Sequence, residues 1–185
     1  MASEIIVNTI KAPTTGANAN KVIIPSGVTL DASGGGLTTP SRHIIQVVTD
    51  RTSGSAIGTT STSYVDSGVG VSITPKFATS KILIEACFTS TSSQGSANAA
   101  GCIYKFYSSI AGGAYSAIRS GNGFLAYNLY SGSYNHNVAQ MMEEISPNTT
   151  GVVAFRIYMR TLTGFQSGIQ RDWGGVNLRA MEIAQ

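Results

Sequence analysis

The sequence contains few of the residues on which most enzyme and metal sites depend. Its 185 residues include two histidines, two cysteines and nine acidic residues. It has no C-x-x-C or H-x-x-x-H spacing for zinc, and no G-x-S-x-G turn for a serine nucleophile. We predict that His43 is a surface residue at a strand end and that His136 lies in a loop. Adjacent Glu143 and Glu144 would point to opposite faces of a strand, which is unsuitable for a glycosidase acid and base pair.

These absences predict a protein that is not an enzyme and binds no metal or cofactor. We expect one of the two glutamates, Glu143 or Glu144, to be buried against a neighbouring subunit. The 21 glycines form no G-x-G-x-x-G or Walker pattern that follows a strand and opens a helix. Phosphate binding by a glycine-rich loop is therefore not supported.

Charge is also scarce, at 11% of residues against roughly 25% in an average soluble domain. Twelve Lys and Arg give a net charge of +3, but they form no run of three, so nothing favours nucleic-acid binding. No apolar run is as long as the roughly 18 residues that a membrane-spanning helix needs. Residues 1–13 contain Glu4, Asn8 and Lys11 where a signal peptide would be apolar. We expect synthesis and folding in a cytosol, without membrane insertion.

Cys87 and Cys102 are too few for a disulfide framework in a chain of this size. In a reducing compartment we expect two free thiols. A bridge between neighbouring strands is the alternative, and the sequence does not decide between them.

The positive signal is alternation of apolar and polar residues, which is typical of strands with one buried face. Residues 81–89 place Ile82, Ile84, Ala86 and Phe88 on one face. Residues 152–162 place Val153, Phe155, Ile157 and Met159 opposite Arg156, Tyr158 and Arg160. Weaker patterns bounded by Gly, Pro, Ser or Asn predict strands over 43–50, 69–74, 101–108, 114–120, 124–130, 138–145 and 176–184. About eight or nine strands and no helix predict an all-β, antiparallel, jelly-roll-like β-sandwich.

The first forty residues differ from the remainder. They hold three of the five prolines, a run of three glycines at 34–36, and only short apolar patches. Such a segment cannot bury enough apolar surface by itself to offset the entropy of ordering it. We therefore predict two parts: an extended N-terminal arm over 1–40, held by a partner, and a β-sandwich head over 41–185. The apolar residues available to the arm are Ile5, Ile6, Val7, Val22, Ile23 and Ile24.

Aromatic and amide side chains concentrate between residues 124 and 137, in a region rich in glycine and serine whose residues 127–137 we predict to form a surface loop. Planar rings cover the apolar faces of sugars, while amides and hydroxyls bond to sugar hydroxyls. The candidate ligand contacts are Tyr127, Asn128, Tyr130, Tyr134, Asn135 and His136, together with Trp173. The alternative interpretation is that the aromatic residues pack a strand edge or a subunit seam.

Four collinear blocks stand out along the chain: NTIKAPTTGANANKVIIPSGVTLDASGG (8–35), TSTSYVDSGVGVSITPKFATSKILI (60–84), ISPNTTGVVAFRIYMR (145–160) and LRAMEIAQ (178–185). Together they resemble tail-fibre or virion structural proteins of marine bacteriophages and cyanophages. Residues 90–140 depart from that resemblance and form its variable part, so no binding residue is carried over.

The resemblance implies a homotrimeric virion surface protein, assembled in the host cytoplasm, with an attachment arm and a jelly-roll-like head. Two functions follow as hypotheses. In the first, it is a tail fibre or spike that docks on other virion proteins and binds a host surface glycan or protein. In the second, it is a capsid decoration or cement protein whose arm bridges capsid subunits. A secreted signalling trimer is disfavoured because no signal peptide is recognised.

Overall fold

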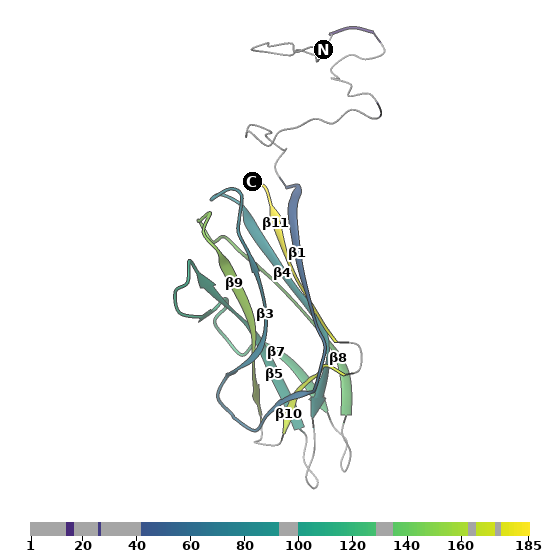
Figure 1. Ribbon diagram of the computed structural model, residues 1–185. Coiled ribbons are helices and arrows are strands. Elements are labelled where there is room, and N and C mark those ends of the chain that lie inside the picture. Colours follow the sequence, from purple (N-terminus) through teal and green to yellow (C-terminus); the bar gives the residue numbers. More distant parts are fainter. Residues whose placement is uncertain are drawn as a thin grey trace. The chain divides into compact units, whose positions relative to one another are not determined.

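The structure is a computed structural model that describes residues 42–92, 100–128, 135–162, 166–172 and 175–185, with residues 14–16 and 26. The chain divides into two units, Met1–Thr38 and Thr39–Gln185. All described strands belong to the second unit (Figure 1). The apolar residues predicted for the arm (Ile5, Ile6, Val7, Val22, Ile23 and Ile24) lie outside the described residues.

The second unit is an all-β, sandwich-like fold of two antiparallel sheets, seen as two layers in Figure 1. One layer, the β4 sheet, has the order β1 (Ile44–Thr52), β11 (Val176–Ile183), β4 (Lys81–Ser92) and β8 (Asn135–Ile145). The other, the β5 sheet, has the order β3 (Val65–Ile73), β9 (Val153–Thr161) and β5 (Ala100–Ile110). The far edge of β5 pairs with β6 (Ser116–Ala117) and β7 (Phe124–Asn128). The described part of the chain contains no helix that could span a membrane.

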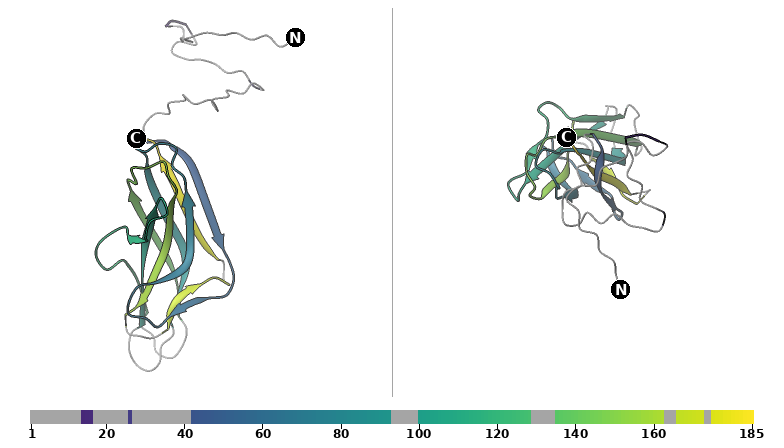
Figure 2. Two further views of the ribbon diagram at one scale, coloured as in Figure 1. Left: turned by 60° about the vertical axis from the view of Figure 1, so that its left-hand side comes forward. Right: turned by 90° about the horizontal axis from the view of Figure 1, so that it is seen from above.

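Two short strands lengthen the β4 sheet at one end. β10 (Ser167–Gln170) pairs with the same edge of β4 as β11 does, from Thr89 to Ser92. β2 (Ile57–Thr59) pairs with β10 as β1 pairs with β11. Each layer is therefore four strands wide along most of its length. Figure 2 shows β1 in blue along one margin of the sandwich, starting at the end where the chain terminates.

The core lies between the two layers, because each long strand turns alternate side chains inward. β4 contributes Ile82, Ile84, Ala86 and Phe88, and β9 contributes Val153, Phe155, Ile157 and Met159, all buried. β5 adds Tyr104 and Phe106, and β11 adds Leu178 and Ala180. Both inward faces expected from the alternation are therefore confirmed.

Tyr104 connects the layers through its hydroxyl, although its side chain is fully buried. The hydroxyl donates to the carbonyl of Gly168 in β10 and accepts from Ser90 Oγ in β4, at 2.8 Å. Its ring packs edge-on against Phe88, with centroids 4.8 Å apart. A buried tyrosine is stable here because its polar atom has partners.

Most predicted strands are present, with two differences. Residues 114–120 contribute only the two-residue β6, because the chain there pairs with β5 at Tyr107 and Ser108 alone. β2 and β10 were not predicted, since each is short and contains a glycine.

Glu143 is 8% exposed, and residues of its own chain bury it. Its carboxylate forms an ion pair with Arg119 at 2.6 Å. The predicted burial against a neighbouring subunit is not needed to explain it.

Candidate functional site

Several of the predicted contact residues fall outside what the structure describes. Tyr130, Tyr134 and Trp173 lie outside the described residues, as do the side chains of Tyr127, Asn128 and Asn135. The backbone of Tyr127 and Asn128 belongs to β7, and Asn135 is the first residue of β8. The predicted strand over 124–130 is present as β7, which pairs with β5 as far as Asn128. The predicted loop over 127–137 is therefore partly strand at both ends, because β8 pairs with β4 from Asn135 onward.

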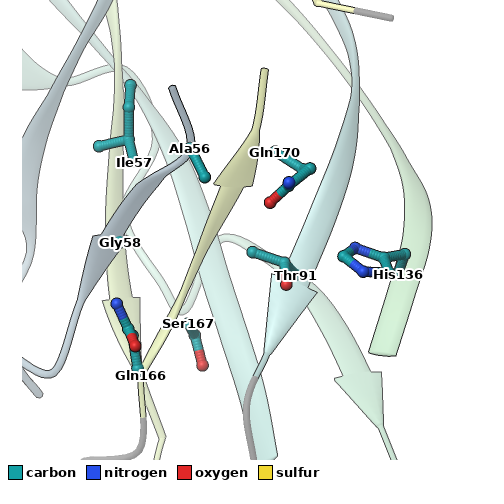
Figure 3. A pocket seen from close by; sticks show the side chains of 8 residues that line it. All are labelled: Ala56, Ile57, Gly58, Thr91, His136, Gln166, Ser167 and Gln170. Atoms are coloured by element: carbon teal, nitrogen blue, oxygen red, sulfur yellow. The ribbon is translucent and has the colours of Figure 1, made fainter. Parts of the chain in front are cut away.

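His136 is the predicted contact whose surroundings the structure describes, and the expectation that it lies in a loop is wrong. It belongs to β8 and pairs directly with Thr91 of β4. Figure 3 shows its ring beside Thr91 at the margin of a cavity that β2 and β10 also line. His43, by contrast, is exposed immediately before β1, as predicted.

The described residues bring together an aromatic and cationic surface that the sequence did not single out. It lies on the outer face of the β5 sheet, away from the core. We call it the tyrosine face and define it by Tyr64, Tyr107, Tyr115, Tyr158, Lys105, Arg156 and Arg160. The four rings come from segments far apart in the sequence, which strand pairing places side by side.

The rings form a continuous group centred on a stacked pair. Tyr107 and Tyr158 lie 3.9 Å apart between centroids, with their planes 21° apart. Tyr64 tilts against Tyr107 at 6.2 Å, and Tyr115 tilts against Tyr158 at 6.4 Å. All four side chains are half-buried, so they pack on one another while presenting surface to solvent.

Three cations lie among these rings. Arg156 Cζ is 4.9 Å from the Tyr115 centroid, and Arg160 Cζ is 5.3 Å from the Tyr64 centroid. Lys105 Nζ also lies over Tyr64, 4.9 Å from the ring centroid. Such contacts attract a cation to the negative face of a ring and limit its movement. Asp66, which pairs with Arg156, adds one negative charge beside these three positive charges, so the tyrosine face is net positive.

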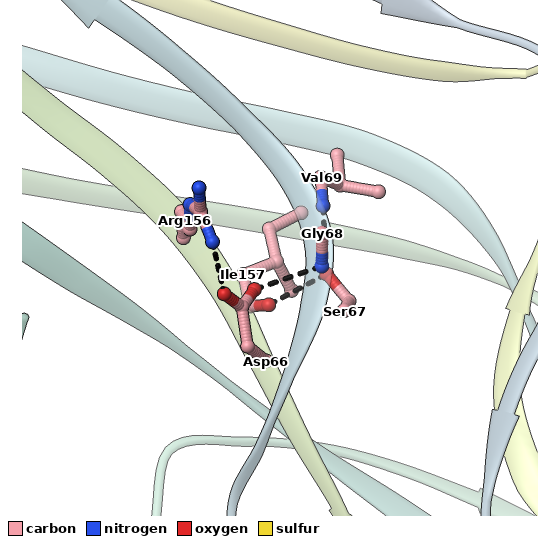
Figure 4. A network of polar contacts seen from close by, with 6 residues as sticks. All are labelled: Asp66, Ser67, Gly68, Val69, Arg156 and Ile157. Carbon is pink, nitrogen blue, oxygen red and sulfur yellow. Dashed lines mark hydrogen bonds and ion pairs between the residues drawn. The ribbon is translucent and has the colours of Figure 1, made fainter.

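A bulge in β3 sets the position of Arg156. Asp66 pairs with Tyr158 and Gly70 pairs with Arg156, so the three residues between them face Ile157 alone. The bulge turns the Asp66 carboxylate toward the Arg156 guanidinium, with which it forms an ion pair (Figure 4). The hydrogen bond from Arg156 to Asp66 raises the pKa of the guanidinium above its ordinary value.

Side chains replace the ladder hydrogen bonds that the bulge interrupts. The Ser67 hydroxyl donates to the Ile157 carbonyl at 2.6 Å and accepts from Val69 N at 3.2 Å. The Asp66 carboxylate also accepts from Gly68 N at 2.8 Å. Gly68 has a φ of 72°, in the left-handed region that glycine adopts without strain. Asp66 is therefore held from two sides before any ligand arrives.

The tyrosine hydroxyls of the stacked pair remain protonated at neutral pH. Partial burial raises the pKa of Tyr107, with a further contribution from Tyr64. Partial burial also raises the pKa of Tyr158, with a further contribution from the Asp66 carboxylate. Each hydroxyl can therefore both donate and accept a hydrogen bond. Rings, hydroxyls and guanidinium groups together suit contact with a sugar or a protein surface.

Part of this surface could have been found in the sequence. The polar face of residues 152–162 carries Arg156, Tyr158 and Arg160 in alternation, which a purely solvated face does not require. Tyr64, Tyr107 and Tyr115 carried no such signal, because their proximity depends on which strands pair.

The remaining reactive groups are separate from the tyrosine face. Cys87 and Cys102 are free thiols, Cys102 being buried in the core. Burial raises the pKa of Cys102 to about 11, so it is a poor nucleophile. Among the residues that the structure describes, no three His, Cys, Asp or Glu side chains are grouped closely enough to hold a metal ion.

Two comparisons of the sequence, with protein-family models and with curated proteins, found no match. The resemblance to phage virion proteins therefore stays a prediction.

Proposed function

We propose that this protein is a non-enzymatic structural protein of a bacteriophage virion, a homotrimeric tail fibre or spike whose head contacts the host surface. The observation that carries the proposal is the tyrosine face, where four half-buried rings and three cations lie together on the outer face of the β5 sheet. The four sequence blocks that resemble phage virion proteins supply the setting.

The head is, in this proposal, a jelly roll. That fold distributes eight strands over two sheets, with the first, eighth, third and sixth in one and the second, seventh, fourth and fifth in the other. Counting β1 with β2, β6 with β7 and β10 with β11 as single interrupted strands gives the same two orders here. Viral capsid and lectin domains commonly use this architecture, which supports a virion role without identifying a ligand.

A host surface glycan suits the tyrosine face better than a flat apolar protein surface does. Stacked Tyr107 and Tyr158 offer apolar area to the C–H faces of sugar rings, and their hydroxyls can bond to sugar hydroxyls. Arg160 adds positive charge that would attract acidic groups of a glycan. Each contact is weak, and a trimer with several copies per particle would multiply it.

Trimerisation would cover the outer face of the β4 sheet. Val138, Met142 and Val47 point outward there and are 79%, 58% and 54% exposed. Glu85 and Arg179 lie between them in register, so the surface carries both signs of charge and could complement a second copy. Light scattering coupled to size exclusion tests this. A trimer that the double variant Val138→Lys, Met142→Lys converts to monomer supports the interface, and an unchanged trimer places it elsewhere.

The N-terminal unit would attach the head to the particle. The head begins next to the C-terminus, since Arg42 N donates to Ala184 O at 2.6 Å. Particles assembled with a protein that lacks residues 1–40 test the attachment. We expect a folded head that is missing from purified particles, and normal incorporation would refute the role of the arm.

The test of host contact is a pair of substitutions at Tyr158. Tyr158→Ala removes the stacked ring, and at a contact of this kind the loss is about 2 kcal/mol, or roughly 30-fold in affinity. Tyr158→Phe keeps the ring and removes only the hydroxyl, so it should retain most of the binding. Binding of the fluorescent protein to host cells is measured by flow cytometry, with thermal unfolding as the folding control. Equal binding by wild type and folded Tyr158→Ala would refute the tyrosine face as the contact surface.

Immunogold labelling of intact particles with an antibody against the head separates the two virion roles. Label on the tail supports the fibre or spike. Label over the whole capsid supports instead the decoration protein, with the tyrosine face packing against capsid subunits.

A further inference from the structure

Two of the three cations of the tyrosine face have firm partners within the protein. Arg156 forms an ion pair with Asp66, so a carboxylate matches its charge. Lys105 is 8% exposed, and its ammonium group donates a hydrogen bond to the carbonyl of Gly121. A carbonyl satisfies a donor but does not neutralise the charge. The chain itself therefore holds both side chains, and little of Lys105 is left to contact a ligand.

Arg160 differs from both, because its guanidinium keeps most of its donors. Its one side-chain hydrogen bond in the described part of the chain joins Nη1 to the Thr62 carbonyl at 3.4 Å, beyond the roughly 2.7–3.2 Å of an ordinary N–H···O bond. No carboxylate of that part of the chain pairs with it. The side chain is half-buried over the Tyr64 ring and keeps accessible surface. Most donors of its planar fork are therefore open to a ligand.

A second unmatched charge lies near Arg160. Lys105 Nζ and Arg160 Cζ are 4.9 Å and 5.3 Å from the centroid of the same ring, that of Tyr64. The two cations are therefore no farther apart than about 10 Å, which is one Debye length at 0.1 M salt. Over that distance salt screens their repulsion only in part. An anion bound at Arg160 would offset the repulsion.

Strand geometry places Arg160 beside the stacked rings. Tyr158 and Arg160 are two positions apart in β9, so both side chains leave the same face of the strand, about 7 Å apart along it. A sugar ring that carries one carboxylate has a comparable length. At the other end of the face, the Asp66 carboxylate pairs with Arg156 and would repel a second anion. An anionic group is therefore expected at the Arg160 end.

We propose that the saccharide bound by the tyrosine face is acidic and that its carboxylate pairs with Arg160. A neutral sugar over Tyr64 and Tyr158 would remove the guanidinium from water without a counter-charge, which is unfavourable. A carboxylate compensates for that loss, because it accepts two parallel charge-assisted hydrogen bonds from the planar fork. A uronic acid supplies this group together with a C–H face for the rings. The inference rests on the proposed function, since it names the class of glycan that this surface would take.

The test is an array of immobilised oligosaccharides probed with the full chain carrying a fluorescent label. The acidic members contain galacturonic, glucuronic or sialic acid, and the neutral members are galactose and glucose oligosaccharides of the same length. We expect binding to acidic members at least about tenfold above the neutral ones, decreasing as salt is added. Methyl esterification of a bound uronic acid oligosaccharide keeps its rings and removes its charge, so the signal should be lost. Equal binding of neutral members, or no binding of any acidic member, would overturn the inference.

Two substitutions at Arg160 locate the carboxylate. Arg160→Gln removes the charge and should weaken binding of the acidic oligosaccharides at least about tenfold, or roughly 1.4 kcal/mol. Arg160→Lys keeps the charge but loses the planar fork, so it should retain only part of the binding. Lys76→Gln is the matched control, because it removes one positive charge from the exposed segment after β3, at the opposite end of that strand from Tyr64. Full binding by folded Arg160→Gln would overturn the inference.

Flow cytometry with host cells separates this inference from the proposed function. If Tyr158→Ala abolishes binding to the cells and Arg160→Gln does not, the tyrosine face is the contact surface but the charge of the glycan is not recognised. If neither folded variant changes binding to the cells, the proposed function fails as well. Loss of binding with both variants, but not with Lys76→Gln, supports the two together.

Discussion

Replacing Tyr104 by phenylalanine tests whether the hydroxyl between the two sheets stabilises the head. The substitution removes one oxygen and keeps the ring, so the edge-on contact with Phe88 is preserved. The hydroxyl lost is the donor to the Gly168 carbonyl and the acceptor from Ser90. Burial raises the pKa of Tyr104 well above its ordinary value, so the hydroxyl is protonated under all ordinary conditions.

The magnitude follows from the two hydrogen bonds and from the burial of their partners. A typical bond contributes about 0.5–1.5 kcal/mol net, and the upper part of that range applies when the remaining partner stays buried. Ser90 is 1% exposed, and Gly168 is buried too. We therefore expect Tyr104→Phe to lower the free energy of unfolding by about 2–3 kcal/mol. In a domain of this size that lowers the melting temperature by about 4–12 °C.

Urea unfolding followed by tryptophan and tyrosine fluorescence measures the change. Tyr107→Phe, on the half-exposed outer face, is the matched control and should change stability by less than about 0.5 kcal/mol. Ser90→Ala, alone and with Tyr104→Phe, completes a double-mutant cycle that isolates the pair. A loss of less than about 0.5 kcal/mol for Tyr104→Phe would refute the reasoning.

Three further predictions concern the core and the sheet edge. Burial raises the pKa of Cys102 from 9.0 to about 11, so between these values the unfolded chain loses a proton that the folded chain keeps. The free energy of unfolding therefore has its full value below pH 9.0 and falls by about 2–3 kcal/mol as the pH rises toward 11. Urea unfolding at several pH values should show this decrease, and Cys102→Ala should make it smaller. Gly168→Ala places a Cβ 1.8 Å from the Ile57 carbonyl oxygen, so hydrogen exchange should show β2 released from β10; unchanged protection of β2 would contradict the strand pairing. The fully buried Glu182 accepts hydrogen bonds from the backbone amides of Lys76 and Phe77, which follow β3, at 2.8 and 3.1 Å. Glu182→Leu should lower the free energy of unfolding by about 3 kcal/mol, measured by calorimetry, and Glu182→Gln should lower it less, because the Gln side-chain oxygen can still accept. Equal losses for the two variants would argue against the amide contacts.

The alternation of side chains was enough to identify the fold class and much of the core. Period two is a local property of a strand, so Ile82 and Phe155 could be assigned to buried faces before any strand was paired. A different signal, Pro147 and Gly151 limiting the segment to strand length, assigned strand structure to residues 138–145 in spite of their helix-forming methionines and glutamates, and β8 confirms it. Short strands that contain a glycine, such as β2 and β10, gave neither signal.

Only the tertiary structure determined where the surfaces lie. His136 was expected in a loop because its neighbours are Tyr and Asn, but pairing with Thr91 continues β8 through it. Tyr64 and Tyr158 are 94 positions apart in the sequence, counted from their residue numbers, yet both belong to one face. The cavity beside His136 likewise depends on β2, β10, β4 and β8 lying side by side, which brings Gly58 near Thr91 and His136. Side-chain periodicity is written in consecutive residues, whereas a binding surface on a sheet depends on which distant strands pair and in what register.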